Sequence, residues 1–299
     1  AGHYTYTVTI TDSSMPTPST IDVTYTLDVA GEPTVTSVSP AIGAIVGGNS
    51  VTITGTHLLG TTSVTIGGAA ASDVYINSET EITATVPAGS AGVASVVVTT
   101  GGGANADNTL YTYAPVPRVS AISPAIGPAA GGTAVAITGT GFSGATNVSV
   151  GGISATGFVV VSDTSITATV PAGTGGSASV EVTTIGGTSR TNTLYTYLLA
   201  PAVTSISPAI GPVAGGTTIT ITGTNLWGAN SVTVGGSPVS AFTVINASTI
   251  IATTPAAATG TASVEVTTDG GTNAGNVLYT YADRSTVTAV NPNLGPTAG

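Results

Sequence analysis

The carboxylates of Glu79 and Glu81 form the most closely spaced acidic pair in this sequence. Side chains two residues apart on a strand lie on the same face, and two carboxylates on one face could act as general acid and general base. A solvated strand edge gives the same pattern, and we favour that interpretation. We therefore predict no catalytic residue here and no enzymatic activity.

Metal binding has two candidate sets. Asp12, Asp22 and Asp28 offer the oxygen ligands that calcium prefers, but the acidic interdomain motifs of calcium-dependent cadherins are absent. His57 follows an ITGT turn with no second ligand in register, so we interpret it as a surface turn residue. We predict no metal ion and no cofactor.

Trp227, in the stretch TNLWGAN, is the only tryptophan. Two other parts of the chain carry Leu59 and Ser143 at the matching position, so we expect Trp227 to be exposed or to lie at an interdomain contact. An exposed indole could instead stack on a sugar ring. The preceding residue is apolar in all three places and is predicted to be buried: Leu58, Phe142 and Leu226.

These matching positions exist because the sequence repeats. SPAIGAIVGG at 39–48 returns as SPAIGPAAGG at 123–132 and SPAIGPVAGG at 207–216, each 84 residues further on. We divide the chain into units 1, 2 and 3, at 33–116, 117–200 and 201–284, with a different segment at 1–32 and the opening of a fourth unit at 285–299. Acids do not follow the repeat: Glu181 and Glu265 correspond to Val97. A carboxylate site built into every unit is therefore not expected.

Each unit predicts about seven short strands. The stretch SASVEVTT alternates apolar and polar side chains, as a half-buried strand does, and turn signals recur every 8–12 residues. This pattern is typical of an immunoglobulin-like β-sandwich. The predicted fold is all-β, with tandem sandwiches in an extended array.

The repeated loop has a structural interpretation. Its proline cannot donate to a β-ladder and should end the first strand or bend it toward the other sheet, and its first glycine suits a positive φ. We predict that the loop carries the first strand across the sandwich. The turn residues concerned are Pro40, Gly43, Pro124, Gly127, Pro208 and Gly211.

The combination of SPxxG…GG, ITGT and VxVGG resembles the IPT/TIG family of immunoglobulin-like domains over residues 33–299. That resemblance implies the sandwich fold, and it implies occurrence in surface and adhesive proteins, receptor ectodomains, secreted carbohydrate-active enzymes or transcription factors. Residues 1–32 resemble the last hairpin of a cadherin-like or related bacterial immunoglobulin-like domain. Because a lone hairpin is marginal in water, we expect its missing strands upstream or in a neighbouring molecule, and we expect the sequence to be an excerpt of a longer chain.

Composition restricts the partners. The net charge is −10, and there is no lysine or cysteine, which argues against nucleic acid as a partner and excludes disulfides. No apolar run is long enough to span a membrane. Thr- and Gly-rich strands with few charges favour an extracellular or cell-surface location. Two N-glycosylation sequons, at Asn147 and Asn246, also occur, as such triplets often do by chance.

We therefore hypothesise a structural or adhesive segment of a large extracellular protein: a stalk, a surface fibre or a filament subunit. Its expected partners are further copies or neighbouring immunoglobulin-like domains, with glycans or a cell-surface receptor as further possibilities. In one variant, a strand of one molecule completes the sheet of the next. The alternatives are glycan-binding accessory domains of a secreted carbohydrate-active enzyme and a phage virion decoration.

Overall fold

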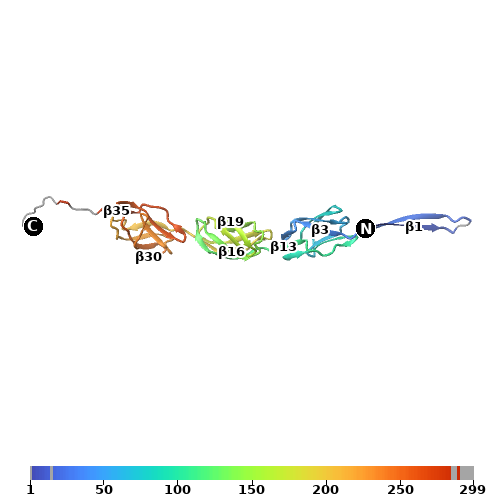
Figure 1. Ribbon diagram of the computed structural model, residues 1–299, viewed down its shortest axis with the longest axis horizontal. Coiled ribbons are helices and arrows are strands. Elements are labelled where there is room, and N and C mark those ends of the chain that lie inside the picture. The colour runs from blue at the N-terminus through green and yellow to red at the C-terminus, as the bar shows by residue number, and fades with distance from the viewer. Residues whose placement is uncertain (1, 14–15, 284–287, 290–299) are drawn as a thin grey trace, which may run out of the picture.

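A computed structural model describes residues 2–13, 16–283 and 288–289, and within them the chain forms strands and no helix. The all-β prediction is therefore confirmed. Three domains and a terminal hairpin follow one another along a single line (Figure 1). In the described residues, no helix is long and apolar enough to cross a membrane. The predicted opening of a fourth unit, at 285–299, falls outside the described residues except for 288–289.

Unit 1 is a two-layer sandwich. One layer is an antiparallel sheet in the order β3-β5-β9-β8, and the other consists of the sheets β12-β11-β6-β7 and β10-β13-β4. Only Ser95 separates β10 from β11, so the second layer is continuous through this strand. The strands are β3 (Thr34–Ser39), β4 (Ile42–Ala44), β5 (Ser50–Thr56), β6 (Ser63–Ile66), β7 (Ala69–Ala70), β8 (Ser72–Ser78), β9 (Glu81–Thr85), β10 (Gly92–Ala94), β11 (Val96–Thr100), β12 (Gly103–Ala104) and β13 (Tyr111–Ala114).

Units 2 and 3 repeat this order of sheets. Each unit has eleven strand segments rather than about seven, because the first strand is split between the sheets, a single serine interrupts the sixth strand, and two two-residue strands close short hairpins. Unit 2 contains β14 (Arg118–Ser123), β15 (Ile126–Pro128), β16 (Ala134–Thr140), β17 (Asn147–Val150), β18 (Ile153–Ser154), β19 (Thr156–Ser162), β20 (Ser165–Thr169), β21 (Gly176–Ala178), β22 (Val180–Thr184), β23 (Gly187–Thr188) and β24 (Tyr195–Leu198). Unit 3 contains β25 (Ala202–Ser207), β26 (Ile210–Pro212), β27 (Thr218–Thr224), β28 (Ser231–Val234), β29 (Ser237–Pro238), β30 (Ala241–Asn246), β31 (Thr249–Thr253), β32 (Gly260–Ala262), β33 (Val264–Thr268), β34 (Gly271–Thr272) and β35 (Tyr279–Ala282).

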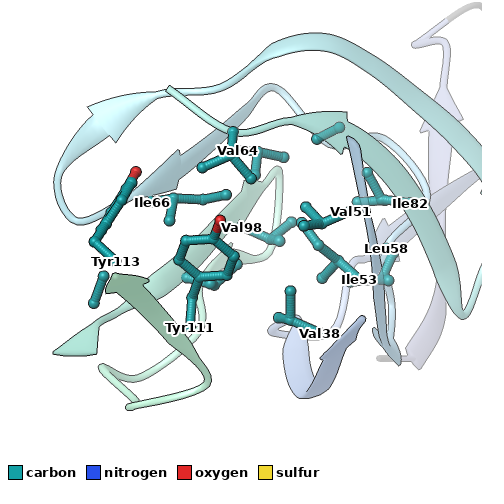
Figure 2. Close-up of a cluster of buried hydrophobic side chains, with 14 residues drawn as sticks. Val38, Val51, Ile53, Leu58, Val64, Ile66, Ile82, Val98, Tyr111 and Tyr113 are labelled. Carbon is teal, nitrogen blue, oxygen red and sulfur yellow. The ribbon is translucent and has the colours of Figure 1, made fainter. Parts of the chain in front are cut away.

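Each unit has its own hydrophobic core between the layers. In unit 1, β-branched residues from both layers surround Tyr111, and Tyr113 closes one end (Figure 2). The two tyrosine rings meet edge to face, with centroids 5.1 Å apart. Tyr113 donates to the carbonyl of Pro87 at 2.8 Å, and its burial raises the pKa of its hydroxyl. The tyrosines at the matching positions of units 2 and 3 are also buried: Tyr195, Tyr197, Tyr279 and Tyr281.

The repeated loop takes the first strand from one layer to the other. β3 ends at Ser39, the bond to Pro40 is cis, and β4 then pairs in parallel with β13 in the opposite layer. The same crossing occurs at β15 with β24 and at β26 with β35. The first and last strands of each unit are thereby hydrogen-bonded to each other.

The expected positive φ at the first glycine of this loop is wrong. Gly43, Gly127 and Gly211 lie outside the left-handed region, which is instead adopted by the later pairs Gly47–Gly48, Gly131–Gly132 and Gly215–Gly216. The first glycine is required for space, because a Cβ there would overlap the hydroxyl of Tyr111, Tyr195 or Tyr279 in the respective unit. The requirement is steric, and it links the crossing strand to the tyrosine core.

Residues 2–29 form an isolated hairpin. β1 (Gly2–Thr11) pairs with β2 (Thr20–Val29) in antiparallel register, with Tyr6 opposite Tyr25. These two rings stack with centroids 5.4 Å apart.

We expect Gly211→Ala to destabilise unit 3 by about 1–3 kcal/mol, the usual cost of overpacking a core, because the new methyl group meets the Tyr279 hydroxyl. Trp227 fluorescence during urea unfolding measures this unit alone, since the chain has no other tryptophan. Gly275→Ala is the matched control, because a Cβ at Gly275 approaches only Ser263 Oγ, at 4.0 Å. Equal midpoints for the two variants would contradict the steric explanation.

Candidate functional site

The end of each unit that faces the preceding segment is built from two loops, which we call the junction loops. One follows the ITGT turn and contains Leu58; the other is the hairpin turn that contains Glu79. The Leu58 amide donates to the Glu79 carbonyl at 2.9 Å, and Phe142 to Asp163 and Leu226 to Ala247 repeat this bond at 3.0 and 2.9 Å. Leu58, Phe142 and Leu226 are fully buried, as predicted. Because backbone atoms and a buried anchor join the loops, their exposed side chains are free to differ between units.

The linker before each unit lies directly on a glycine of that unit. A Cβ at Gly186 would overlap the carbonyl of Pro115, and one at Gly270 would overlap that of Leu199. A Cβ at Gly102 would likewise overlap the carbonyl of Gly31. Three successive connections therefore approach their domain at a distance that only glycine permits.

Two side chains of the junction loops also hold the linker. His57 and Asn225 both have a φ of 56°, which turns their side chains toward the preceding segment. His57 Nδ1 lies 3.2 Å from the Glu32 carbonyl, and Asn225 Nδ2 donates to the Ala200 carbonyl at 3.1 Å. His57 is thus a linker contact as well as a turn residue. The sequence pattern indicated the turn but not this contact with the linker, because the matching residue of unit 2 is Gly141.

Unit 2 stabilises its junction loops differently. Its equivalent residue, Gly141, has no side chain, and the carboxylate of Asp163 accepts hydrogen bonds from the Gly141 amide at 3.1 Å and from the Ser143 hydroxyl at 2.9 Å. The bond from the Ser143 hydroxyl, followed by those from the Gly141 and Ser143 amides, lowers the pKa of Asp163 below its ordinary value of 3.8. A groove of about 540 Å³ runs beside these residues along the linker from unit 1.

Trp227 occupies the same junction of unit 3. Its side chain is 69% exposed, and with Leu199 and Ala247 it lines a groove of about 380 Å³ between the linker and the junction loops. The groove is the counterpart of the one in unit 2, shifted by one repeat. An exposed indole at the rim of a groove can stack on a flat apolar partner, including a sugar ring.

The other sequence candidates do not converge on one site. Glu79 is exposed, while Glu81 is half-buried and accepts a hydrogen bond from Asn77 at 2.9 Å. Asp22 accepts from Thr9 across the hairpin at 2.6 Å. Asp12 accepts from the Ser19 amide at 3.0 Å near the hairpin turn. Within the described residues, no group of three or more His, Asp or Glu side chains is arranged to hold a metal ion.

The hairpin offers a second candidate surface. Its register places apolar residues opposite apolar residues, so one face is continuous and uncharged, while the other is formed mainly by threonines. Nearly all of these apolar side chains are exposed. The face, which we call the hairpin face, contains Tyr4, Tyr6, Val8, Ile10, Ile21, Val23, Tyr25 and Leu27.

Comparison with known proteins agrees with the repeat. The family described as IPT/TIG domain matches residues 33–113, 117–197 and 201–281. Plexin-A3 of Rattus norvegicus is 31% identical over 216 residues, which are 65% of this chain and 11% of Plexin-A3. The chain therefore spans only a small part of the length of that relative.

Solved structures show likeness at lower identity. The full extracellular region of Plexin A4 is 24% identical with a TM-score of 0.37, over 78% of this chain and 22% of that one. SGBP-B, from a complex xyloglucan utilization locus in Bacteroides uniformis, is 21% identical with a TM-score of 0.28, over 64% of this chain and 56% of that one.

We expect Asp163→Ala to lower the thermal unfolding midpoint at neutral pH, because the Gly141 and Ser143 groups lose their acceptor. The folded-state pKa of Asp163 lies below 3.8, so its stabilisation is present above that pH and is lost as the pH falls through the folded-state pKa. Calorimetry should therefore show a difference from the parent protein at pH 7 that disappears in strong acid. Glu79→Ala, at the same position of unit 1, is the control. A difference that persists in strong acid would refute this origin.

Proposed function

This chain belongs to the IPT/TIG family of immunoglobulin-like domains, and from that premise we propose that it is a non-catalytic structural or adhesive segment of a large extracellular protein. In this proposal the segment provides length and stiffness, as part of a stalk, a surface fibre or a filament. The observation that carries this proposal is the junction, at which the linker carbonyl rests against a glycine in each successive unit.

Stiffness follows from how the junction is built. Linkers that contain Pro115 and Pro117, or Pro201, have restricted backbones, and contact with Gly186 or Gly270 removes further freedom. At about 35–40 Å per domain, from strand rise and loops, three units give a rod of about 100–120 Å. Arrays whose units contact only their neighbours extend without any new type of contact.

Composition supports an exposed location. With only three arginines in the chain, there is no basic surface for nucleic acid. A surface of threonine, serine and glycine is soluble and offers few charges for a specific electrostatic partner. We place the segment outside the cell or on its surface.

The hairpin face is the proposed contact with a neighbouring immunoglobulin-like domain. An uncharged face of aromatic and aliphatic residues has the character of the inner layer of a β-sandwich. The proposed occupant is the second sheet of such a domain. Supplied by another copy, that sheet would make the chain a filament subunit; supplied by the same polypeptide, it would make the chain part of a stalk.

Glycan binding is the second candidate, favoured by the exposure of Trp227 at its groove. In that case the units would be accessory domains of a secreted carbohydrate-active enzyme. A phage virion decoration is a third setting, in which the same rod would project from a particle.

We expect small-angle scattering from the chain to fit a rigid rod, and Gly186→Ala with Gly270→Ala to broaden its distribution of lengths. Each methyl group displaces a linker carbonyl, so the domains should gain freedom while remaining folded. Gly101→Ala is the control, because a Cβ at Gly101 meets nothing within 4 Å. Unchanged scattering from the double variant would argue against the glycine contacts as the source of stiffness.

For the glycan alternative, we expect Trp227→Ala to abolish retardation of the chain in gels that contain xyloglucan or mixed-linkage glucan. The loss would follow from removing the stacking surface. Trp227→Leu restores the residue type of unit 1, Leu59, and serves to separate aromatic stacking from general apolar contact. No retardation of the parent chain would remove this alternative for these two polysaccharides.

A further inference from the structure

The turn between β30 and β31 carries an asparagine, Asn246, where the other two units carry Ser78 and Ser162. In all three units the residue that ends the strand accepts a hydrogen bond from the amide two positions later. Ser78 accepts from Thr80 at 3.1 Å and Ser162 from Thr164 at 3.2 Å. In unit 3, Asn246 Oδ1 accepts from the Ser248 amide at 2.8 Å. Serine is therefore sufficient for this turn, and the asparagine needs another explanation.

Asn246 is the first residue of an N-glycosylation sequon, NAS, at an exposed hairpin tip. Its Oδ1 also accepts from the Ser248 hydroxyl at 2.8 Å, so the hydroxyl and the amide of the sequon are already in contact. All three residues of the triplet are exposed. The side-chain amide is therefore accessible from solvent.

The second sequon, NVS at Asn147, has the opposite surroundings. Asn147 begins β17 and pairs with Thr183 of β22, and Ser149 is 8% exposed. Its sequon lies in a sheet rather than in a turn. The two asparagines have the same sequence motif and differ in access, which makes Asn147 an internal comparison.

Trp227 lies on the adjoining loop. The Leu226 amide donates to the carbonyl of Ala247, the middle residue of the sequon, at 2.9 Å, and Ala247 and Trp227 line the same groove. A sugar on Asn246 would emerge beside an indole that is 69% exposed. Unit 3 combines the sequon and the tryptophan, whereas unit 1 has Ser78 with Leu59 and unit 2 has Ser162 with Ser143 at these positions.

We propose that Asn246 is an N-glycosylation site and that the first sugars of its glycan pack against Trp227. The donor is an oligosaccharide joined through phosphate to a lipid carrier. Asn246 Nδ2 forms the bond to the anomeric carbon as the bond from that carbon to the phosphate oxygen breaks. The lipid phosphate leaves, and one amide proton passes to a base. The inference rests on the turn and its neighbouring loop, and it stands apart from the proposed stalk function.

The modification is tested by mass spectrometry of protein isolated from the cells that naturally make it. Trypsin cleaves after arginine, so the sequons fall into separate fragments, 119–190 with Asn147 and 191–284 with Asn246. We expect fragment 191–284 to carry sugar on Asn246 and fragment 119–190 to carry none on Asn147. An unmodified Asn246, including the case of sugar on serine or threonine alone, would overturn the proposal.

The packing on Trp227 is tested with Asn246→Ser, which preserves the turn bond that Ser78 and Ser162 make. Produced in the same cells, this variant should show a red-shifted tryptophan emission and stronger quenching by acrylamide than the parent protein. Asn147→Ser, which restores the residue of Ser63 and Ser231, should change neither. If Asn246 carries sugar but Asn246→Ser leaves emission and quenching unchanged, the glycan does not cover Trp227 and that part is refuted.

Discussion

The pairing of the first and last strands of each unit is the constraint on which this structure depends. A strand that began in one sheet and stayed there would leave the final tyrosine strand at an open edge. Instead the chain crosses after Pro40 and pairs with β13, and Gly43 brings the crossing strand against the Tyr111 hydroxyl. Because the final strand is held at the core, the linker leaves each unit from a defined point. The crossing inside a domain therefore sets the direction of the next one.

At the junctions, backbone contacts are constant while side chains vary. The bond between the junction loops joins an amide to a carbonyl in every unit, and the linker meets glycine in every unit. The side-chain contacts differ. His57 and Asn225 form hydrogen bonds with linker carbonyls, whereas in unit 2 the carboxylate of Asp163 forms a hydrogen bond between the junction loops. A repeat can thus keep its geometry while each copy acquires a different surface, which explains why the charged residues do not follow the 84-residue period.

The sequence predicts the fold well because its signals are periodic. Alternation marks the strands, proline and the glycine pairs mark the turns, and repetition identifies the burial of Leu58, Phe142 and Leu226. The reason for Gly43 could not be found in this way, since a positive φ and a lack of space both select glycine. The linker role of His57 depends on its distance to Glu32, a contact between segments that local patterns do not describe. Trp227 was predicted to be exposed or at a contact, and its exposed side chain lines the junction groove.

The chemistry of the junction bears on how such a rod responds to its surroundings. The contacts described there are hydrogen bonds to linker carbonyls and close approaches to glycine, and none of them needs a cation. Interactions between exposed charges weaken as salt is added, whereas steric contacts and hydrogen bonds between neutral groups are much less affected. With three arginines and no lysine, the chain has few basic side chains with which to form ion pairs at its junctions. Apart from the Asp163 carboxylate in unit 2, the contacts described at the junctions join neutral groups, so we expect the geometry of the array to depend little on ionic strength.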